Sequence, residues 1–403
     1  MWTENKLSLK TVVVGAGAAG NKAVVNLIKN NTIRLDEAIL INSTVRDLPE
    51  GFDNNGNFIN ITTNIDDGGS AKEPKIAEAL TIEALKSGRL NLEELIPVET
   101  DLVIFIGGLE GGTGNGSIPV MAKYVRDRLG FKVHILAIKG FGSDARGLDN
   151  TISFFKKMQA NYAIQCIDNN KFLAQAKNNF RKAEELANDE IVSRVATLRG
   201  FNILPSEQNI DEKELRKIAT REGYVNTEYY EIPDDIKIKN VETFNDIIKE
   251  IIDNSKGLDI SKPSQKCMGI IINLPESEQQ YIDFKFPLIK ETYGNPFEIY
   301  PHIQNVQGMP RFISFICTGM KMPIEELKAI QENFKKEFLA VDVEEDDFFN
   351  ELKSFSSAPS GLFDLDEATP TKNKQQQDKD DFLDDMFSAF NSGNEGNNED
   401  FNF

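Results

Sequence analysis

Residues 107–117 read Gly-Gly-Leu-Glu-Gly-Gly-Thr-Gly-Asn-Gly-Ser, a glycine-rich stretch in the first third of the chain. The apolar run Leu102–Ile106 precedes it and predicts a buried strand, whereas Pro119 to Leu129 has helical spacing. Six glycines in eleven residues are costly to order, and a simple turn would need only one or two. Because a glycine loop at a helix N-terminus presents backbone N–H groups to anions, the stretch predicts a phosphate-binding loop.

A second glycine motif lies near the N-terminus. Residues 15–20 have the pattern G-x-G-x-x-G between a predicted strand at 9–14 and a predicted helix at 22–29, the context of a dinucleotide-binding fingerprint. A nicotinamide-dependent oxidoreductase is therefore one interpretation. Such an enzyme would place an acidic residue where the second strand ends, but the strand predicted at 37–41 ends in Asn42-Ser43-Thr44. The P-loop pattern with its lysine is also absent, so backbone amides would have to hold the phosphates.

Strands and helices alternate along the first half of the chain, which predicts an α/β fold with a doubly wound parallel sheet. In such sheets ligands bind at the carboxyl ends of the strands, where the loops after the predicted strands gather. Further on we expect strands at 267–274, 299–304 and 311–318 and helices at 241–254, 277–291 and 323–338. We assign residues 1–177 to a nucleotide-binding domain, 178–223 to a long central helix and a polar loop, 224–341 to a second, smaller α/β domain, and 342–403 to a disordered acidic tail.

Charge and composition exclude several classes of function. The chain has a net charge of −19, of which residues 341–403 carry −13, so no basic footprint for direct nucleic-acid binding exists. No stretch reaches the roughly 20 apolar residues of a membrane span and no signal peptide is visible, so we expect a cytoplasmic protein without membrane insertion. The three separated cysteines predict buried free thiols, no cluster suggests zinc, and His134 is expected to be structural.

Several motifs together resemble the tubulin/FtsZ superfamily of GTPases, over about residues 9–320. Residues 111–116 resemble its GGGTG[ST]G signature, with Glu110 in place of the first glycine and Asn115 in place of the Ser/Thr. Residues 15–24 resemble the first nucleotide loop of the family, and residues 42–44 and 68–72 resemble the second and third. The segments 141–146, 168–171 and 188–189 resemble the parts that surround the ribose and the guanine.

This resemblance implies that the chain binds GTP or GDP. The residues expected to contact the nucleotide are Gly15, Gly17, Ala18, Ala19, Gly20, Asn21, Asn42, Ser43, Gly69, Ser70, Ala71, Gly111, Gly112, Thr113, Gly114, Asn115, Gly116, Asp144, Arg146, Asn169 and Asn188. Mg²⁺ is expected on the phosphate oxygens with most of its waters retained, and no residue is assigned as a metal ligand. A solvated helix residue is the alternative interpretation of Asn188.

The resemblance also implies how hydrolysis would occur. Asn209, Asp211 and Glu214 resemble the family's synergy loop, N-x-D-x-x-D, with glutamate at the last position. In the family this loop reaches the nucleotide of the next subunit, so the catalytic site is complete only in a head-to-tail filament. A non-closing contact of this kind builds a filament of identical copies. A simple helix cap is the alternative interpretation of Asp211.

Within the superfamily, the acidic tail favours a TubZ-type protein that positions or segregates plasmid or phage DNA through an adaptor protein bound to the tail. A divergent FtsZ acting in cell division is the close alternative. Glu110 puts a carboxylate near the expected phosphates, where it would repel the nucleotide, help to hold Mg²⁺ or point away. It therefore motivates a third hypothesis, a scaffold that binds GTP without hydrolysing it.

Overall fold

The structure, a computed structural model, describes residues 7–47, 57–62, 69–142, 144–158, 161–204, 206 and 210–339, with side chains described as far as residue 332. Residues 1–328 form one compact unit, and a second unit begins at Ala329. The predicted tail, 342–403, and Asn209 lie outside the described residues.

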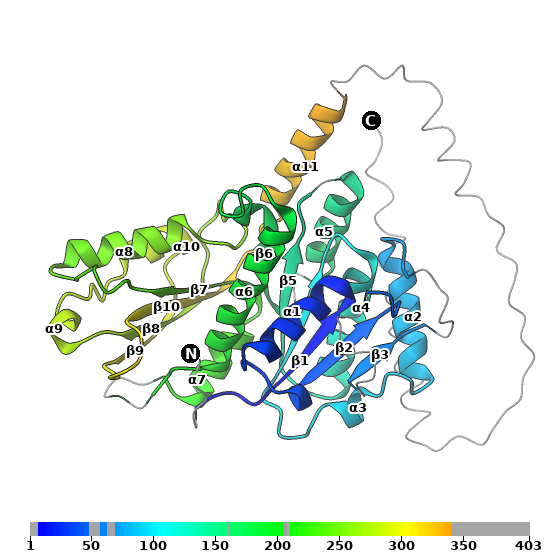
Figure 1. The fold of residues 1–403 in the computed structure, drawn as a ribbon, viewed down its shortest axis with the longest axis horizontal. Helices are drawn as coiled ribbons and strands as arrows, with labels where there is room; N and C mark the ends of the chain where they lie inside the picture. The colour runs from blue at the N-terminus through cyan, green and yellow to red at the C-terminus, as the bar shows by residue number, and fades with distance from the viewer. Residues whose placement is uncertain are drawn as a thin grey trace, which may run out of the picture. The chain divides into compact units, whose positions relative to one another are not determined.

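One sheet runs through the described part of the first unit (Figure 1). Its strands, in spatial order, are β3 (Phe58–Asn60), β2 (Ala38–Asn42), β1 (Thr11–Ala16), β4 (Leu102–Gly108), β5 (Val133–Lys139), β6 (Ala163–Asp168), β7 (Gly223–Glu231), β10 (Phe312–Met320), β8 (Cys267–Asn273) and β9 (Glu298–Gln304). Neighbouring strands pair in parallel except at β10, which is antiparallel to both β7 and β8. The predicted parallel α/β sheet is thus present, as part of a larger mixed sheet.

Helices cover both faces of the sheet. On one face α1 (Gly17–Lys29) packs beside α6 (Phe180–Arg199), and α7 (Glu212–Thr220) follows α6 in the chain (Figure 1). On the other, α4 (Gly112–Lys123) contacts α2 (Pro74–Lys86) and α5 (Ala145–Met158). The remaining helices are α3 (Leu92–Leu95), α8 (Val241–Asp253), α9 (Glu276–Gln279), α10 (Pro287–Tyr293) and α11 (Ile324–Leu339), with short helical turns at Leu35–Glu37, Tyr124–Arg128 and Asn169–Phe172. None of the helices among the described residues is both long and apolar enough to span a membrane.

The two glycine motifs are largely helical, which corrects the predicted helix starts. α1 begins at Gly17 instead of residue 22, and α4 begins at Gly112, which leaves Pro119 inside the helix rather than in its first turn. Close packing explains why glycines continue into α4. A Cβ on Gly116 would stand 2.1 Å from the carbonyl oxygen of Pro74, so only glycine allows α4 and α2 to approach so closely.

The second half of the chain differs from the prediction in two elements. The strand β7 was not predicted, because its residues Asn226 to Glu228 are polar although they are buried in the middle of the sheet. The single helix predicted at 277–291 is wrong: the chain forms α9 and α10, since Phe286 has a left-handed φ of 46° and Pro287 opens a new helix. Strands β7 to β10 continue the same sheet, and the domain boundaries at 177, 223 and 341 stay predictions.

Candidate functional site

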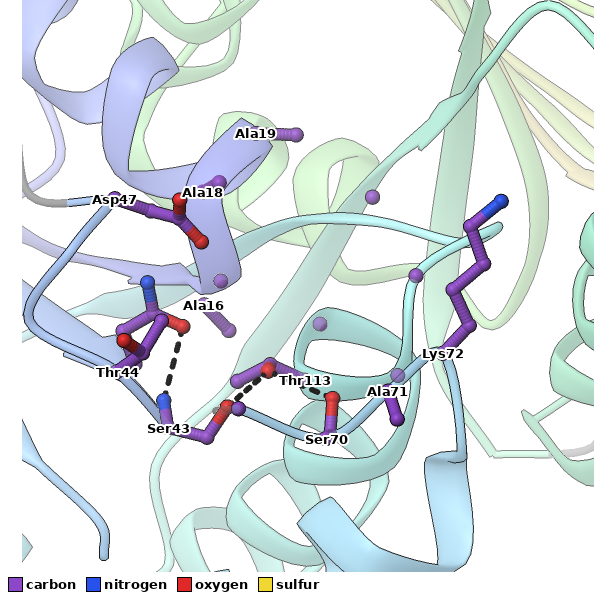
Figure 2. A pocket seen from close by; sticks show the side chains of 17 residues that line it. Ala16, Ala18, Ala19, Ser43, Thr44, Asp47, Ser70, Ala71, Lys72 and Thr113 are labelled. Atoms are coloured by element: carbon purple, nitrogen blue, oxygen red, sulfur yellow. Dashed lines mark hydrogen bonds between the residues drawn. The ribbon is translucent and has the colours of Figure 1, made fainter. Parts of the chain in front are cut away.

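A cavity of about 330 Å³ lies where β1, β2 and β4 end. The strand order reverses between β1 and β4, so the cavity occupies the place where open α/β sheets bind their ligands. Figure 2 shows this cavity. It is lined by Ala16, Gly17, Ala18, Ala19, Asn42, Ser43, Thr44, Asp47, Gly69, Ser70, Ala71, Lys72, Gly108, Gly111, Gly112, Thr113 and Gly114.

Two helix N-termini converge on this cavity, those of α1 and α4. Neither helix has an acidic residue in its first turn, so no carboxylate within either helix opposes the positive end of its dipole. Gly17 has φ 72°, and a Cβ there would stand 3.1 Å from the backbone nitrogen of Gly114. The start of α1 and the start of α4 can therefore approach closely because the residues that face each other, Gly17 and Gly114, have no side chains. This arrangement suits the binding of an anion with two or more phosphate groups.

A row of hydroxyl groups joins three of the lining segments. The Ser43 Oγ lies 2.7 Å from the Thr113 Oγ1, and the Ser70 Oγ lies 3.1 Å from the same atom, as the dashed lines in Figure 2 show. The backbone N–H of Ser43 is held in turn by the Asn42 Oδ1 at 2.9 Å. These bonds connect the end of β2, the loop before α2 and the start of α4, so they fix the cavity wall before any ligand binds.

Ion pairs connect the loop before α2 with the start of α5. The Lys72 Nζ lies 2.7 Å from the Asp144 Oδ2. In the second pair the cation comes from the α5 side and the carboxylate from the α2 side, because Arg146 pairs with Glu73. The Lys72 ammonium and the backbone N–H of Gly147 lower the pKa of the Asp144 carboxyl. Lys72 lines the cavity, whereas the predicted nucleotide ligands Asp144 and Arg146 do not.

Five further residues that were predicted to contact the nucleotide do not line the cavity: Gly15, Gly20, Asn21, Asn115 and Gly116. They build the structure beneath it. A Cβ on Gly20 would lie 2.2 Å from the carbonyl oxygen of Ile106, so this glycine lets α1 rest on β4. The buried Asn21 amide donates to Ile41 O at 3.2 Å, and the Asn115 amide donates to Leu109 O at 2.7 Å and to Asn150 O at 2.8 Å.

Glu110 points away from the cavity. Its Oε1 accepts the backbone N–H of Gly142 at 2.8 Å, and the carboxylate lies against Gly140, where a Cβ would come within 2.4 Å of it. Burial raises the pKa of this carboxyl, while the N–H of Gly142 and the charge of Lys139 act in the opposite direction. Of the three expectations for Glu110, repulsion of the nucleotide, a role in Mg²⁺ binding and orientation away from the phosphates, the geometry agrees with the third.

Asn169 and Asn188, the residues predicted to lie near the ribose and the base, are not among the residues that line the cavity. Asn169 follows β6 and is buried, and its Oδ1 has no hydrogen-bond partner among the described residues. Asn188 is half-buried on α6, and its neighbour Asp189 accepts a hydrogen bond from the Asn26 amide at 3.1 Å.

Asp211 and Glu214 are at the start of α7, and neither lines the cavity. The Asp211 Oδ1 accepts the Glu214 N–H at 2.8 Å, and the Glu214 Oε2 accepts the Asp211 N–H at 2.9 Å. The two carboxylates thus form a capping box, which is the structural alternative considered for Asp211. Asp211 is exposed and Glu214 half-buried.

Five lining residues were not among the predicted contact residues: Ala16, Thr44, Asp47, Lys72 and Gly108. All except Asp47 lie inside the loop segments 15–24, 42–44, 68–72 and 107–117 that the sequence indicates, so taking every residue of those loops as a candidate would have found them. Asp47 lies three residues beyond the second of these loops and carries no such signal. Asp47 and Lys72 are the charged side chains that line the cavity within the described residues, and Figure 2 shows them on opposite sides of the view.

Comparison with known proteins gives partial sequence matches. The FtsZ cell division protein of Mycoplasmopsis pulmonis is 26% identical over 214 residues, which is 52% of this chain and 53% of that protein. The tubulin-like protein CetZ of Thermococcus kodakarensis is 30% identical over 147 residues, 36% of this chain and 38% of that protein. The chain thus spans about half the length, or less, of the curated relatives it matches. No protein-family model matches the chain.

Solved structures resemble the chain over most of its length. CetZ1 of Haloferax volcanii, a GDP-bound monomer, has a TM-score of 0.63 at 17% identity and covers 80% of this chain and 98% of its own. TubZ of Clostridium botulinum phage c-st has a TM-score of 0.61 at 19% identity, over 82% of this chain and 99% of its own. TubZ of Bacillus thuringiensis, in a GTPγS-form protofilament, has a TM-score of 0.63 at 16% identity, over 83% and 94%. The sequence matches are thus to FtsZ and to tubulin-like CetZ, and the solved structures of CetZ and TubZ share the fold of this chain.

Proposed function

We propose that this protein binds a guanine nucleotide in the cavity beyond β1, β2 and β4 and hydrolyses GTP when copies of the chain assemble head to tail. The observation that carries the proposal is the convergence of two glycine-rich helix N-termini, α1 and α4, on one cavity wall. Backbone N–H groups and the positive ends of helix dipoles at such a wall are suited to bind phosphate groups. Two similar structures support a guanine nucleotide as the ligand: CetZ1 of Haloferax volcanii is bound to GDP and CetZ2 to GTPγS.

The donor set of the cavity fits Mg²⁺ as a companion of the nucleotide. The lining carries the hydroxyls of Ser43, Ser70 and Thr113 and the carboxylate of Asp47, all hard oxygen atoms of the kind that Mg²⁺ prefers. Mg²⁺ in such sites is held chiefly by phosphates and water, and it neutralises their charge when bound. Asp47 is the residue that would orient its water shell.

Hydrolysis requires a group that orients a water molecule in line with the terminal phosphate. Asp211 and Glu214 of one protomer are the acidic groups proposed for this role, acting on the nucleotide of the next protomer. Both carboxylates lie outside their own chain's cavity, which agrees with action across a contact between copies. Protofilaments of CetZ2 and of Bacillus thuringiensis TubZ, and a two-stranded TubZ filament, support assembly of this kind.

Binding and light-scattering measurements test the proposal. The purified chain should bind GTP and GDP in preference to NAD. Scattering should rise after GTP or a slowly hydrolysed analogue is added, and it should decay only with GTP. Tighter binding of NAD than of GTP would instead favour a nicotinamide-dependent oxidoreductase, and tight GTP binding without phosphate release would favour a non-hydrolysing scaffold.

For the cellular role, we propose a TubZ-type filament that positions or segregates plasmid or phage DNA through an adaptor. The two TubZ proteins among the similar structures and the acidic C-terminal composition support this role. A fluorescent fusion should follow foci of the plasmid or phage DNA. A ring at the division site would favour the alternative, a divergent FtsZ.

A further inference from the structure

One face of the strand β9 bonds to residues shortly before α7 and to Lys217 within α7. Glu298, Tyr300, His302 and Gln304 alternate along β9, so their side chains share one face of the sheet. Gln304 bonds to residues 202 and 204, His302 to residue 210, and Tyr300 and Glu298 to Lys217. The order of these residues along β9 is the reverse of the order of their partners along the chain.

Gln304 holds the beginning of the segment. Its Nε2 donates to the carbonyl oxygen of Asn202 at 2.7 Å, and its Oε1 accepts the N–H of Leu204 at 2.9 Å. Asn202 has a left-handed φ of 63°, a conformation that asparagine adopts more readily than most residues other than glycine. Asn202 and Gln304 are both buried, so the Gln304 amide gives the Asn202 carbonyl oxygen a hydrogen-bond partner away from water.

His302 holds the end of the segment, one residue before Asp211. Its Nδ1 accepts the Ile210 N–H at 3.3 Å, and its Nε2–H donates to the Gln304 Oε1 at 3.0 Å. The imidazole is fully buried, and both bonds require the neutral form with its proton on Nε2. A ring held at both nitrogens cannot rotate, so the backbone at Ile210 has a fixed partner.

We propose that His302 and Gln304 are positioning residues that set where Asp211 stands for hydrolysis across the contact between protomers. The inference rests on the proposed function and adds to it a determinant on β9. Neither residue lines the cavity; His302 is bonded to Ile210, and Gln304 to Asn202 and Leu204. Because catalysis is sensitive to misplacement of about 1 Å, losing the bond at Ile210 should lower turnover without changing nucleotide affinity.

A pair of amide substitutions tests the role of the Ile210 bond. In His302→Asn the side-chain Oδ1 takes the place of Nδ1 and can still accept the Ile210 N–H. In His302→Gln the amide lies at the place of Nε2, so Gln304 keeps a partner and Ile210 loses one. GTP turnover per assembled protomer should fall roughly tenfold to a hundredfold in His302→Gln and stay near wild type in His302→Asn. The affinity of the unassembled protomer for GDP should be unchanged in both.

Two control variants separate the role of His302 from a general effect of altering β9 and from a failure of the proposed function. Tyr300→Phe removes the bond from the same strand to Lys217, at 3.2 Å, and should leave turnover unchanged. Asp211→Ser serves as the reference for the proposed function: wild-type turnover in that variant would refute the function itself. If Asp211→Ser is inactive while His302→Gln turns over at the wild-type rate, the inference about β9 alone is wrong.

Equal loss of turnover in His302→Asn and His302→Gln would also overturn the inference, because it would show a demand for imidazole rather than for an acceptor at Ile210. If His302→Gln does not yield folded protein, Gln304→Asn replaces it. Its amide is one methylene too short to reach Asn202 and Leu204 together, so the same loss of turnover with unchanged GDP affinity is expected. Wild-type turnover per assembled protomer in Gln304→Asn would contradict the inference.

Discussion

Asp211 and Glu214 cap each other at the start of α7: each carboxylate accepts the backbone N–H of the other residue, at 2.8 and 2.9 Å. A capping box of this kind satisfies two N–H groups that a helix would otherwise leave unpaired. The same two carboxylates are the ones proposed to act on the nucleotide of a neighbouring protomer. Both the stability of the fold and the turnover of GTP are therefore expected to depend on Asp211. A substitution that keeps the cap and removes the carboxylate can distinguish the two roles.

The substitution Asp211→Ser removes the carboxylate and keeps a good helix cap, since a serine hydroxyl can accept the Glu214 N–H. We expect its free energy of unfolding to stay within about 0.5 kcal/mol of wild type, and its GTP turnover to be lost. Asp211→Ala should lose turnover as well and in addition about 1 kcal/mol of stability. Urea unfolding and phosphate release measure the two effects. Full turnover in Asp211→Ser would leave Asp211 only its role as a cap.

Two glycines of the nucleotide motifs are predicted to behave differently when replaced by alanine. Gly20→Ala puts a methyl group 2.2 Å from the Ile106 carbonyl oxygen and should destabilise the fold by about 1–3 kcal/mol. Gly111 lines the cavity, and a Cβ there meets no atom within 4 Å. Gly111→Ala should therefore fold with at most about 1 kcal/mol lost and bind GDP more weakly. Thermal unfolding with GDP titration checks both, and the opposite ranking in stability would contradict the packing argument.

Lys72 is the cationic side chain that lines the cavity within the described residues. Lys72→Gln should lower the affinity for GTP about tenfold at low ionic strength, and the loss should shrink as salt is added, because the attraction is screened. The matched control is Lys75→Gln, three residues further on at the start of α2, whose side chain is exposed and does not line the cavity. Titration with a fluorescent GTP analogue measures the affinities, and equal losses in the two variants would show a general charge effect.

The buried His134 predicts a loss of stability in mild acid. Its Nδ1–H donates to Ala219 O at 2.7 Å, and burial lowers its pKa from 6.5 to about 4. The unfolded chain therefore binds a proton between pH 6.5 and pH 4 that the folded chain excludes, so folding stability decreases as the pH falls through that window. The expected loss between pH 7 and pH 5.5 is about 1 kcal/mol. Urea unfolding at both pH values should show a smaller difference for His134→Asn, and an identical difference would contradict the assignment.

The sequence indicates β1, β2 and β4 well, because each of them is an apolar run that ends in a glycine or polar loop. The strand β3, with three half-buried residues, was not predicted. Twelve of the predicted contact residues line the cavity, from Gly17 in the first loop to Gly114 in the last. The others could not be separated in advance. Gly20 and Gly116 belong to the same motifs as the lining glycines, and only the packing of α1 on β4 and of α4 on α2 distinguishes them.

The second half of the chain is harder to predict because several of its buried residues are polar. Their hydrogen-bond and ion-pair partners lie far away in the sequence. Glu228 in β7 pairs with Arg194 of α6 at 3.8 Å, and neither residue signals the other in the sequence. His302 contacts Ile210 across 92 positions and Gln304 contacts Asn202 across 102. Local patterns contain no information about such pairs, so the role of β9 beside α7 emerges only from the folded structure.

If the active centre is shared between protomers, the specific GTP turnover must depend on protein concentration. Turnover per protomer should be near zero at low concentration, rise steeply once scattering shows assembly, and then level off. A variant blocked in assembly should bind GTP and not cleave it. Turnover that is independent of concentration, or full cleavage by an isolated protomer, would contradict the account.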